Sequence, residues 1–145
     1  MRQHMSLDTF GKVIEFIKAQ GKPNVHFHFY GGEALLHPDI WVMTEFLREN
    51  FQNIQFKLST NLNHPYEVIS KIPSDFNVFA SLHSDFVSDY MDWFANVKWV
   101  QTNCSLREVS LMTQERNIGE MIVLYELWHD QLPVTIYPID QYIEK

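Results

Sequence analysis

Residues 26–39 read HFHFYGGEALLHPD and combine an alternating run, a paired-glycine turn and a helix start. Histidine and aromatic residues alternate up to Tyr30, which is typical of a strand with one apolar face. Gly31 and Gly32 permit a sharp turn, and the His37-Pro38-Asp39 triplet suits the first turn of a helix. The stretch therefore predicts a strand, a turn and a helix. In a parallel α/β protein a small ligand binds at such a turn.

The same alternation of strands and helices extends in both directions from this stretch. A helix capped by Ser6 precedes it and ends before Gly21. Helical spacing recurs after His37, from Pro65 to Ile72, from Phe86 to Val97 and from Ile118 to Trp128, and strand patterns cover 25–30, 54–58, 76–82, 109–112 and 133–138. We therefore expect an α/β domain with about five parallel strands and flanking helices. An open doubly wound sheet and a partial (β/α) barrel both fit this order, and periodicity does not separate them.

Length and composition favour one globular domain over residues 1–145. The chain is 46% hydrophobic with a net charge of -7, and this charge argues against a general nucleic-acid or anionic-membrane surface. There is no apolar run of membrane-spanning length and no signal-peptide pattern. Cys104, the single cysteine, excludes an internal disulfide framework. We expect a cytoplasmic protein.

Polar residues gather where the predicted strands end, and ligands bind at the carboxyl ends of parallel strands. Gly31 and Gly32 would leave backbone groups open to a ligand, and Glu33 adds a carboxylate suited to an ammonium group. Taken alone, the more probable interpretation is a tight turn beside a solvated glutamate. The G-x-G-x-x-G and P-loop patterns are absent, so dinucleotide and nucleotide sites of those types have no support.

Several other side chains have both a functional and a structural interpretation. His26 and His28 share one face of a strand and would suit a metal, although histidines at such positions are more often structural. A metal hydrolase using them with His83 is the weakest hypothesis. Cys104 is expected in a loop as an incidental thiol. The aromatic stripe that includes Trp93 is expected mostly to pack on its helix, and partial exposure of Trp93 and Trp99 stays open.

Taken together, these motifs resemble the radical S-adenosylmethionine (radical SAM) superfamily. The resemblance rests on the aromatic strand running into Gly31-Gly32-Glu33, the following ALLHPD, and the later strand ends Ser59-Thr60-Asn61 and Ser81-Leu82-His83. It covers about residues 6–138. It implies a partial parallel (β/α) barrel of the TIM-barrel-like type.

The resemblance also implies a cofactor site for S-adenosylmethionine (SAM). In the family the Gly-Gly-Glu edge holds the amino group of SAM, which assigns that contact to Gly31, Gly32 and Glu33. Later strand ends meet the methionine carboxylate and the ribose, which makes Asn61, Ser81 and His83 candidates. The adenine and substrate side maps only loosely onto Met112, Thr113 and Tyr137.

One family feature is missing from the sequence. Family members bind a [4Fe–4S] cluster through C-x-x-x-C-x-x-C in the loop after the first strand, and Cys104 cannot replace three thiolate ligands. Because the pattern also begins with a helix, we expect a fragment of a longer radical SAM core without its first strand and cluster loop. The alternative is a non-catalytic SAM-binding, small-molecule or protein-interaction module. An uncovered sheet edge would favour self-association.

Overall fold

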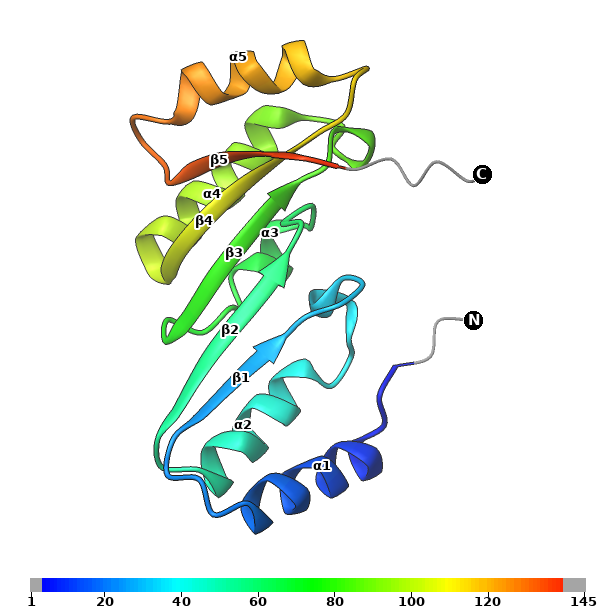
Figure 1. Cartoon of the computed structure of the whole chain (residues 1–145), viewed down its shortest axis with the longest axis vertical. Coiled ribbons are helices and arrows are strands. Elements are labelled where there is room, and N and C mark those ends of the chain that lie inside the picture. Colours follow the sequence, from blue (N-terminus) through cyan, green and yellow to red (C-terminus); the bar gives the residue numbers. More distant parts are fainter. Residues whose placement is uncertain (1–3, 140–145) are drawn as a thin grey trace.

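The computed structural model describes residues 4–139, and it shows a sheet flanked by helices (Figure 1). Residues 1–3 and 140–145 of the expected domain lie outside the described range. The strands are β1 (Val25–Phe29), β2 (Ile54–Thr60), β3 (Phe76–Leu82), β4 (Ser105–Thr113) and β5 (Val134–Pro138). The α-helices are α1 (Leu7–Ala19), α2 (Ile40–Asn50), α3 (Tyr66–Ile69), α4 (Tyr90–Asn103) and α5 (Ile118–Trp128), and two 3-10 turns are η1 (Ala34–Leu36) and η2 (Ser84–Phe86).

The sheet confirms the expected α/β class with parallel strands. All four neighbouring pairs are parallel, and the strands lie in sequence order from β1 to β5. A doubly wound sheet reverses its strand order at a switch point, and this sheet does not. Right-handed crossovers that always advance in one direction place their helices on one face. The architecture is therefore compatible with a partial (β/α) barrel and excludes the doubly wound alternative.

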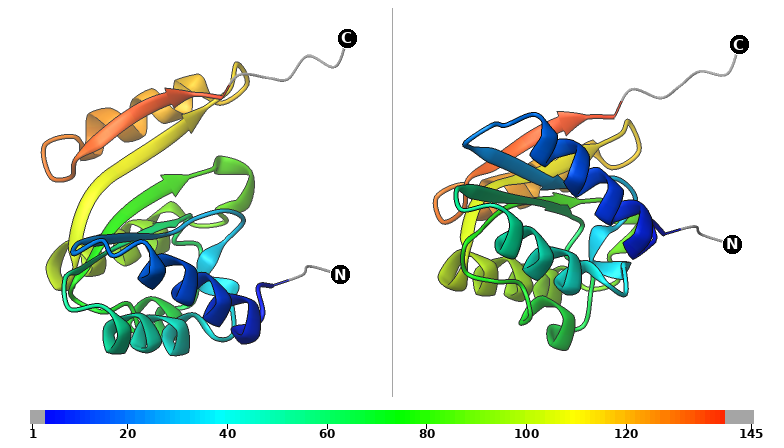
Figure 2. Two further views of the ribbon diagram at one scale, coloured as in Figure 1. Left: turned by 60° about the horizontal axis from the view of Figure 1, so that its bottom comes forward. Right: turned by 90° about the horizontal axis from the view of Figure 1, so that it is seen from below.

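The two faces of the sheet differ in their side chains. On β2, Phe56, Leu58 and Thr60 are buried, whereas Lys57 and Ser59 on the opposite face remain partly exposed. The same alternation runs along β3 and most of β4. Helices α2, α3 and α4 lie behind the sheet in Figure 1, with α1 and α5 at its two ends. Figure 2 shows that the sheet is strongly twisted. The core lies between the helices and one sheet face, and the other face is open.

Local signals account for most of the element ends. The Ser6 hydroxyl caps α1 by accepting from the Thr9 amide, as expected, and Gly21 ends the helix with φ +61°. The Asp89 carboxylate accepts from the amides of Met91 and Asp92 and fixes the start of α4.

Three sequence predictions about the second half of the chain are wrong in detail. Helix α4 begins at Tyr90, and Phe86 instead lies exposed in η2. Strand β4 begins at Ser105, four residues before the predicted Val109, because α4 passes into it with only Cys104 between them. Cys104 therefore caps a helix and is not in a loop. The expected packing of the aromatic stripe holds for Trp93, which is only 2% exposed.

None of the helices within residues 4–139 is both long enough and apolar enough to span a membrane.

Candidate functional site

The turn after β1 uses both of its glycines in a conformation that favours glycine. Gly31 has φ +92° and Gly32 has φ +54°, in the left-handed region that side chains rarely adopt. A Cβ atom on either residue would meet nothing within 4 Å, so the requirement is conformational and not spatial. Within the described residues neither glycine forms a backbone hydrogen bond. Their amides and carbonyls are therefore open to water or a ligand.

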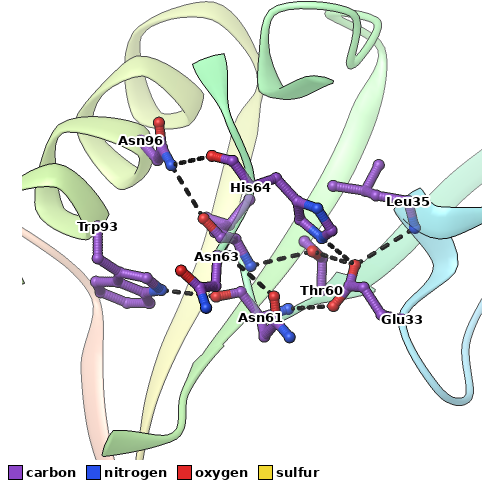
Figure 3. Close-up of polar contacts among 9 residues, drawn as sticks. Glu33, Leu35, Thr60, Asn61, Asn63, His64, Trp93 and Asn96 are labelled. Atoms are coloured by element: carbon purple, nitrogen blue, oxygen red, sulfur yellow. Dashed lines mark hydrogen bonds and ion pairs between the residues drawn. The ribbon is translucent and has the colours of Figure 1, made fainter. Parts of the chain in front are cut away.

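Glu33, the next residue, is buried and joins the ends of two strands (Figure 3). Its Oε1 accepts from the Thr60 hydroxyl at 2.6 Å and from the Leu35 amide at 3.3 Å. Its Oε2 accepts from the Asn61 amide at 2.8 Å. The side chain is only 9% exposed, so the expectation of a solvated glutamate is wrong. The carboxylate links the turn after β1 to the end of β2.

His64 completes the buried surroundings of this carboxylate. Its Nε2 lies 3.3 Å from Oε1 of Glu33, and the imidazole side chain is 8% exposed. The two atoms are in contact but not aligned for a hydrogen bond, so Nε2 has no hydrogen-bond partner among the described residues. Burial alone would raise the pKa of Glu33, but the His64 ring, the Asn61 amide and the Thr60 hydroxyl lower it below its ordinary value. The carboxylate is charged at neutral pH.

Helix α4 holds the loop between Asn61 and His64 from the other side (Figure 3). The Trp93 indole N–H donates to the Asn61 carbonyl at 2.6 Å. The Asn96 amide donates to the carbonyls of Leu62 and His64, both at 3.0 Å. Leu62 is fully buried with φ +50°, a strained conformation for a leucine that these contacts keep in place. The loop after β2 is thus a rigid wall beside the glycine turn.

The six predicted cofactor residues fall into two groups. Gly31, Gly32 and Glu33 are consecutive, and the backbone of Asn61 joins them through Glu33. Ser81 and His83 lie at the end of β3, and no side-chain hydrogen bond within the described residues joins them to Glu33 or Asn61. Burial lowers the pKa of His83 despite the nearby Asp85 carboxylate. Their shared site remains a prediction.

The candidates for the adenine and substrate side end β4 and β5. The Thr113 hydroxyl is buried and donates to the Tyr137 carbonyl at 3.0 Å. The nearby Glu108 carboxylate raises the pKa of the Tyr137 phenol. Met112 is partly exposed on the open face between them. These groups are engaged with each other, and their role toward a ligand is untested.

The chain's own residues do not fit an iron–sulfur cluster. Cys104 lies at the amino end of β4, far along the fold from the glycine turn, and its Sγ contacts the Ile72 carbonyl at 3.7 Å. Burial raises the pKa of this thiol to about 11, which disfavours the thiolate. Between residues 4 and 139, no three His, Cys, Asp or Glu side chains are grouped to hold a metal ion, so His26, His28 and His83 are not brought together.

Two residues of this site, His64 and Asn96, were not singled out from the sequence. Thr60 was named only as part of a polar strand end, and Trp93 was considered only for packing or exposure. His64 stands next to Pro65 in an ordinary turn sequence. Only the three-dimensional proximity of α4 and the two loops identifies them.

Comparison with known proteins adds nothing to this description, since no family model and no curated protein matches the sequence.

Proposed function

We propose that this chain is the SAM-binding part of a radical SAM-type core, with the partial barrel and strand-end site that the resemblance implies. The observation that carries the proposal is the glycine turn beside a buried, charged Glu33. That carboxylate is tied to the end of the next strand, and the neighbouring backbone groups are left open.

The turn suits the methionine end of SAM, which carries an ammonium and a carboxylate. An ammonium group donates up to three hydrogen bonds, and the Gly31 and Gly32 carbonyls are open acceptors. The negative charge of Glu33 favours a cation nearby, although its oxygens are already bonded. In this proposal Glu33 positions the turn and supplies charge, while the glycine backbone makes the contact. Asn61, Ser81 and His83 would meet the carboxylate and ribose.

The reaction of the family needs a [4Fe–4S] cluster, which supplies the electron that splits SAM into a 5′-deoxyadenosyl radical. Residues 4–139 offer no ligand set for it. We therefore propose binding, and not SAM cleavage, for this chain by itself. Catalysis would require thiolates from polypeptide other than the described residues.

Calorimetric titration with SAM tests the proposal. We expect a measurable heat of binding, which Ser81→Ala and His83→Ala weaken by about tenfold together. Ser105→Ala, at the amino end of β4 and so at the opposite end of the sheet from the strand ends that would meet SAM, is the matched control and should bind as the unchanged chain does. If no heat of binding is measured at millimolar SAM, the proposal that this chain binds SAM is wrong.

The second candidate is a non-catalytic module that binds a protein partner, and the surface of α5 favours it. Ile122, Val123 and Leu127 are all exposed on this helix although it also buries Met121 and Leu124. Such apolar exposure on several sides of one helix is common at interaction surfaces. Self-association through an uncovered sheet edge belongs to the same group of hypotheses. A chain that binds no SAM but associates in solution would favour this candidate.

A further inference from the structure

The outer side of β1 has a groove of about 290 Å³ whose lining comes from both faces of the strand. Phe27 and Phe29 reach it from the helix face, and His28 and Tyr30 reach it from the open face. A pocket that meets both faces of one strand runs along the free backbone edge of that strand. Further apolar lining comes from the helices, with Phe10 of α1 and with Ile40 and Met43 of α2, and from Met5 and Ala34. We call this space the β1 groove.

Helix α1 lies on the outer side of β1, above the β1 groove. A crossover helix packs over the gap between the two strands that it joins, and α1 leads into β1 from its outer side (Figure 1). The Phe10 ring lies 5.7 Å from that of Phe27, at right angles to it, and the β1 groove lies below. The space therefore fits an extended strand running parallel to β1.

The backbone of β1 is free to pair on this side. The Val25 amide donates to the Asn53 carbonyl of the β2 side at 2.9 Å, so Val25, Phe27 and Phe29 direct their backbone groups toward β2. By alternation, His26 and His28 direct theirs to the outer side of β1, where His28 lines the groove. No proline or lysine protects this edge, as such residues do on many edge strands.

The opposite edge of the sheet has a compatible strand. In β5 the Pro133 carbonyl accepts from Val109, so Val134, Ile136 and Pro138 direct their backbone groups outward. Pro138 has no N–H, and the Val134 amide is bonded to the Leu132 carbonyl at 2.9 Å. Outward donation thus comes only from Ile136, and this limits the registers in which β5 can pair.

We propose that the β1 groove receives β5 of a second copy of this chain, in parallel and head to tail. With Ile136 of the second copy opposite Phe27, three hydrogen bonds form. The Ile136 amide donates to the His26 carbonyl, and the amides of His26 and His28 donate to the carbonyls of Val134 and Ile136. The Ile136 side chain enters the apolar groove, and Thr135 lies beside His26 on the open face. This register uses every outward donor that β5 has.

Charge complementarity supports a second copy as the occupant. The α5–β5 unit (residues 118–138) carries Glu120, Glu126 and Asp130 with no lysine or arginine. The α1–β1 unit (residues 7–29) carries three lysines against two acidic residues. Head-to-tail pairing brings these units together, with α1 and α5 as neighbouring helices. Phe16 of α1 is 67% exposed and Leu127 of α5 is 61% exposed, and the contact would cover apolar surface of this kind.

A heterologous contact between two edges either closes into a ring or continues as a filament. Antiparallel pairing of β1 with the β1 of a second copy would form neither a ring nor a filament. It would also bring two α1 helices over one gap. One end of the β1 groove is lined by Gly31 and Glu33 and so adjoins the SAM contacts proposed above. The proposed pairing with β5 uses the backbone groups of His26 and His28, and it does not depend on SAM binding. The chain can associate without binding SAM, and it can bind SAM without associating.

Cysteine cross-linking of the full chain tests the register. In a Cys104→Ala background, His26→Cys protein and Thr135→Cys protein are prepared separately and mixed under oxidation. Because His26 lies opposite Thr135 across the proposed contact, we expect a disulfide-linked dimer in the mixture and none from either protein alone. Cross-linking of His26→Cys protein by itself would show β1 pairing with β1 and overturn the proposal.

Sedimentation analysis over a range of concentrations tests the association itself. We expect concentration-dependent dimers or longer assemblies, and His26→Pro should weaken the association by roughly tenfold by removing an outward N–H. His26→Ala keeps that N–H and is the matched control. A chain that stays monomeric at 100 µM, or an equal effect of both substitutions, would overturn the proposal. The proposal would also be overturned if a peptide strand from another polypeptide abolished the association while His26→Pro left it unchanged.

Discussion

The loop after β2 and the loop after β3 leave the same edge of the sheet but are held by different kinds of contact. The first, residues 61–64, is fixed by the buried Glu33 carboxylate and by the buried Trp93 indole. The second, residues 83–89, is held at its surface by an ion pair between Arg116 and Asp85 whose side chains are 63% and 48% exposed. It is also held by the Asn117 amide, which donates to the Ser84 hydroxyl at 2.8 Å, and by the Asn63 amide, which donates to the Phe86 carbonyl. We therefore expect residues 61–64 to form a rigid wall of the candidate site, and residues 83–89 to form a wall that can adjust to a ligand.

The energetic basis of this difference is desolvation. A buried donor that loses its acceptor cannot turn to water, so breaking a buried contact costs more than the contact itself contributes. An exposed ion pair is replaced by hydration at little cost. Four substitutions or conditions test this contrast.

The largest effect is expected from Glu33→Ala. It leaves the Asn61 amide and the Thr60 hydroxyl without their acceptor, and we expect the free energy of unfolding to fall by about 3 kcal/mol. Urea denaturation followed by tryptophan fluorescence measures this. Asp85→Ala is the control and should change the value by about 0.5 kcal/mol or less. Equal losses from both substitutions would show that the two loops are held alike.

Acid should weaken the first loop through the same carboxylate. The folded pKa of Glu33 lies below its ordinary value of 4.5, so its contribution to stability is full above pH 4.5 and is lost as pH falls through the folded pKa. Comparison with Glu33→Gln removes the effect of other carboxylates. We expect the stability difference between the two proteins to be constant from pH 7 to 5 and to shrink below 4.5. A difference that persists unchanged at pH 3 would contradict the assignment.

Trp93→Phe should have an intermediate effect. It removes the N–H that donates to the Asn61 carbonyl and part of the stacked contact with Trp128, whose ring centroid is 5.8 Å away. We expect a loss of about 2 kcal/mol in the free energy of unfolding. Trp99→Phe on the same helix removes a half-buried indole whose N–H has no such role, and it should cost less than half as much. The reverse order would count against the clamp.

Arg116→Ala should have the smallest effect. Its guanidinium pairs with Asp85 at the surface, and we expect a change within about 0.5 kcal/mol that disappears in 1 M salt. Thermal unfolding at low and high salt measures it. A loss as large as that of Trp93→Phe would mean that the second loop is also rigid.

Much of the fold followed from local sequence patterns. The alternation in residues 25–30, the cap at Ser6 and the glycine turn each act within a few residues, and the structure places them as expected. The start of β4 was misplaced where a helix and a strand join without a loop. The polar run Gln101-Thr102-Asn103-Cys104-Ser105 is typical of a loop, but in the structure it belongs to the end of α4 and the start of β4.

The chemistry of the site was less accessible from the sequence. Glu33 is bonded to groups 27 and 28 residues further along the chain, and periodicity gives the face of a residue but not such partners. The burial of its carboxylate depends on His64 and on α4, which packs over the loop. The sequence was enough to predict the glycine turn. It was not enough to predict that the Glu33 carboxylate is buried and hydrogen-bonded.

The sequential order of the sheet also has a consequence for how the chain reaches this fold. Every paired residue in the four ladders lies 20 to 29 positions from its partner. Loop closure over such separations is fast, and no strand must wait for a distant one. Each new strand emerging from the ribosome finds its neighbour already synthesised, so the sheet can grow by addition from the amino-terminal end. The glycine turn is complete only when β2 has arrived, because Glu33 stays uncompensated until Thr60 and Asn61 reach it.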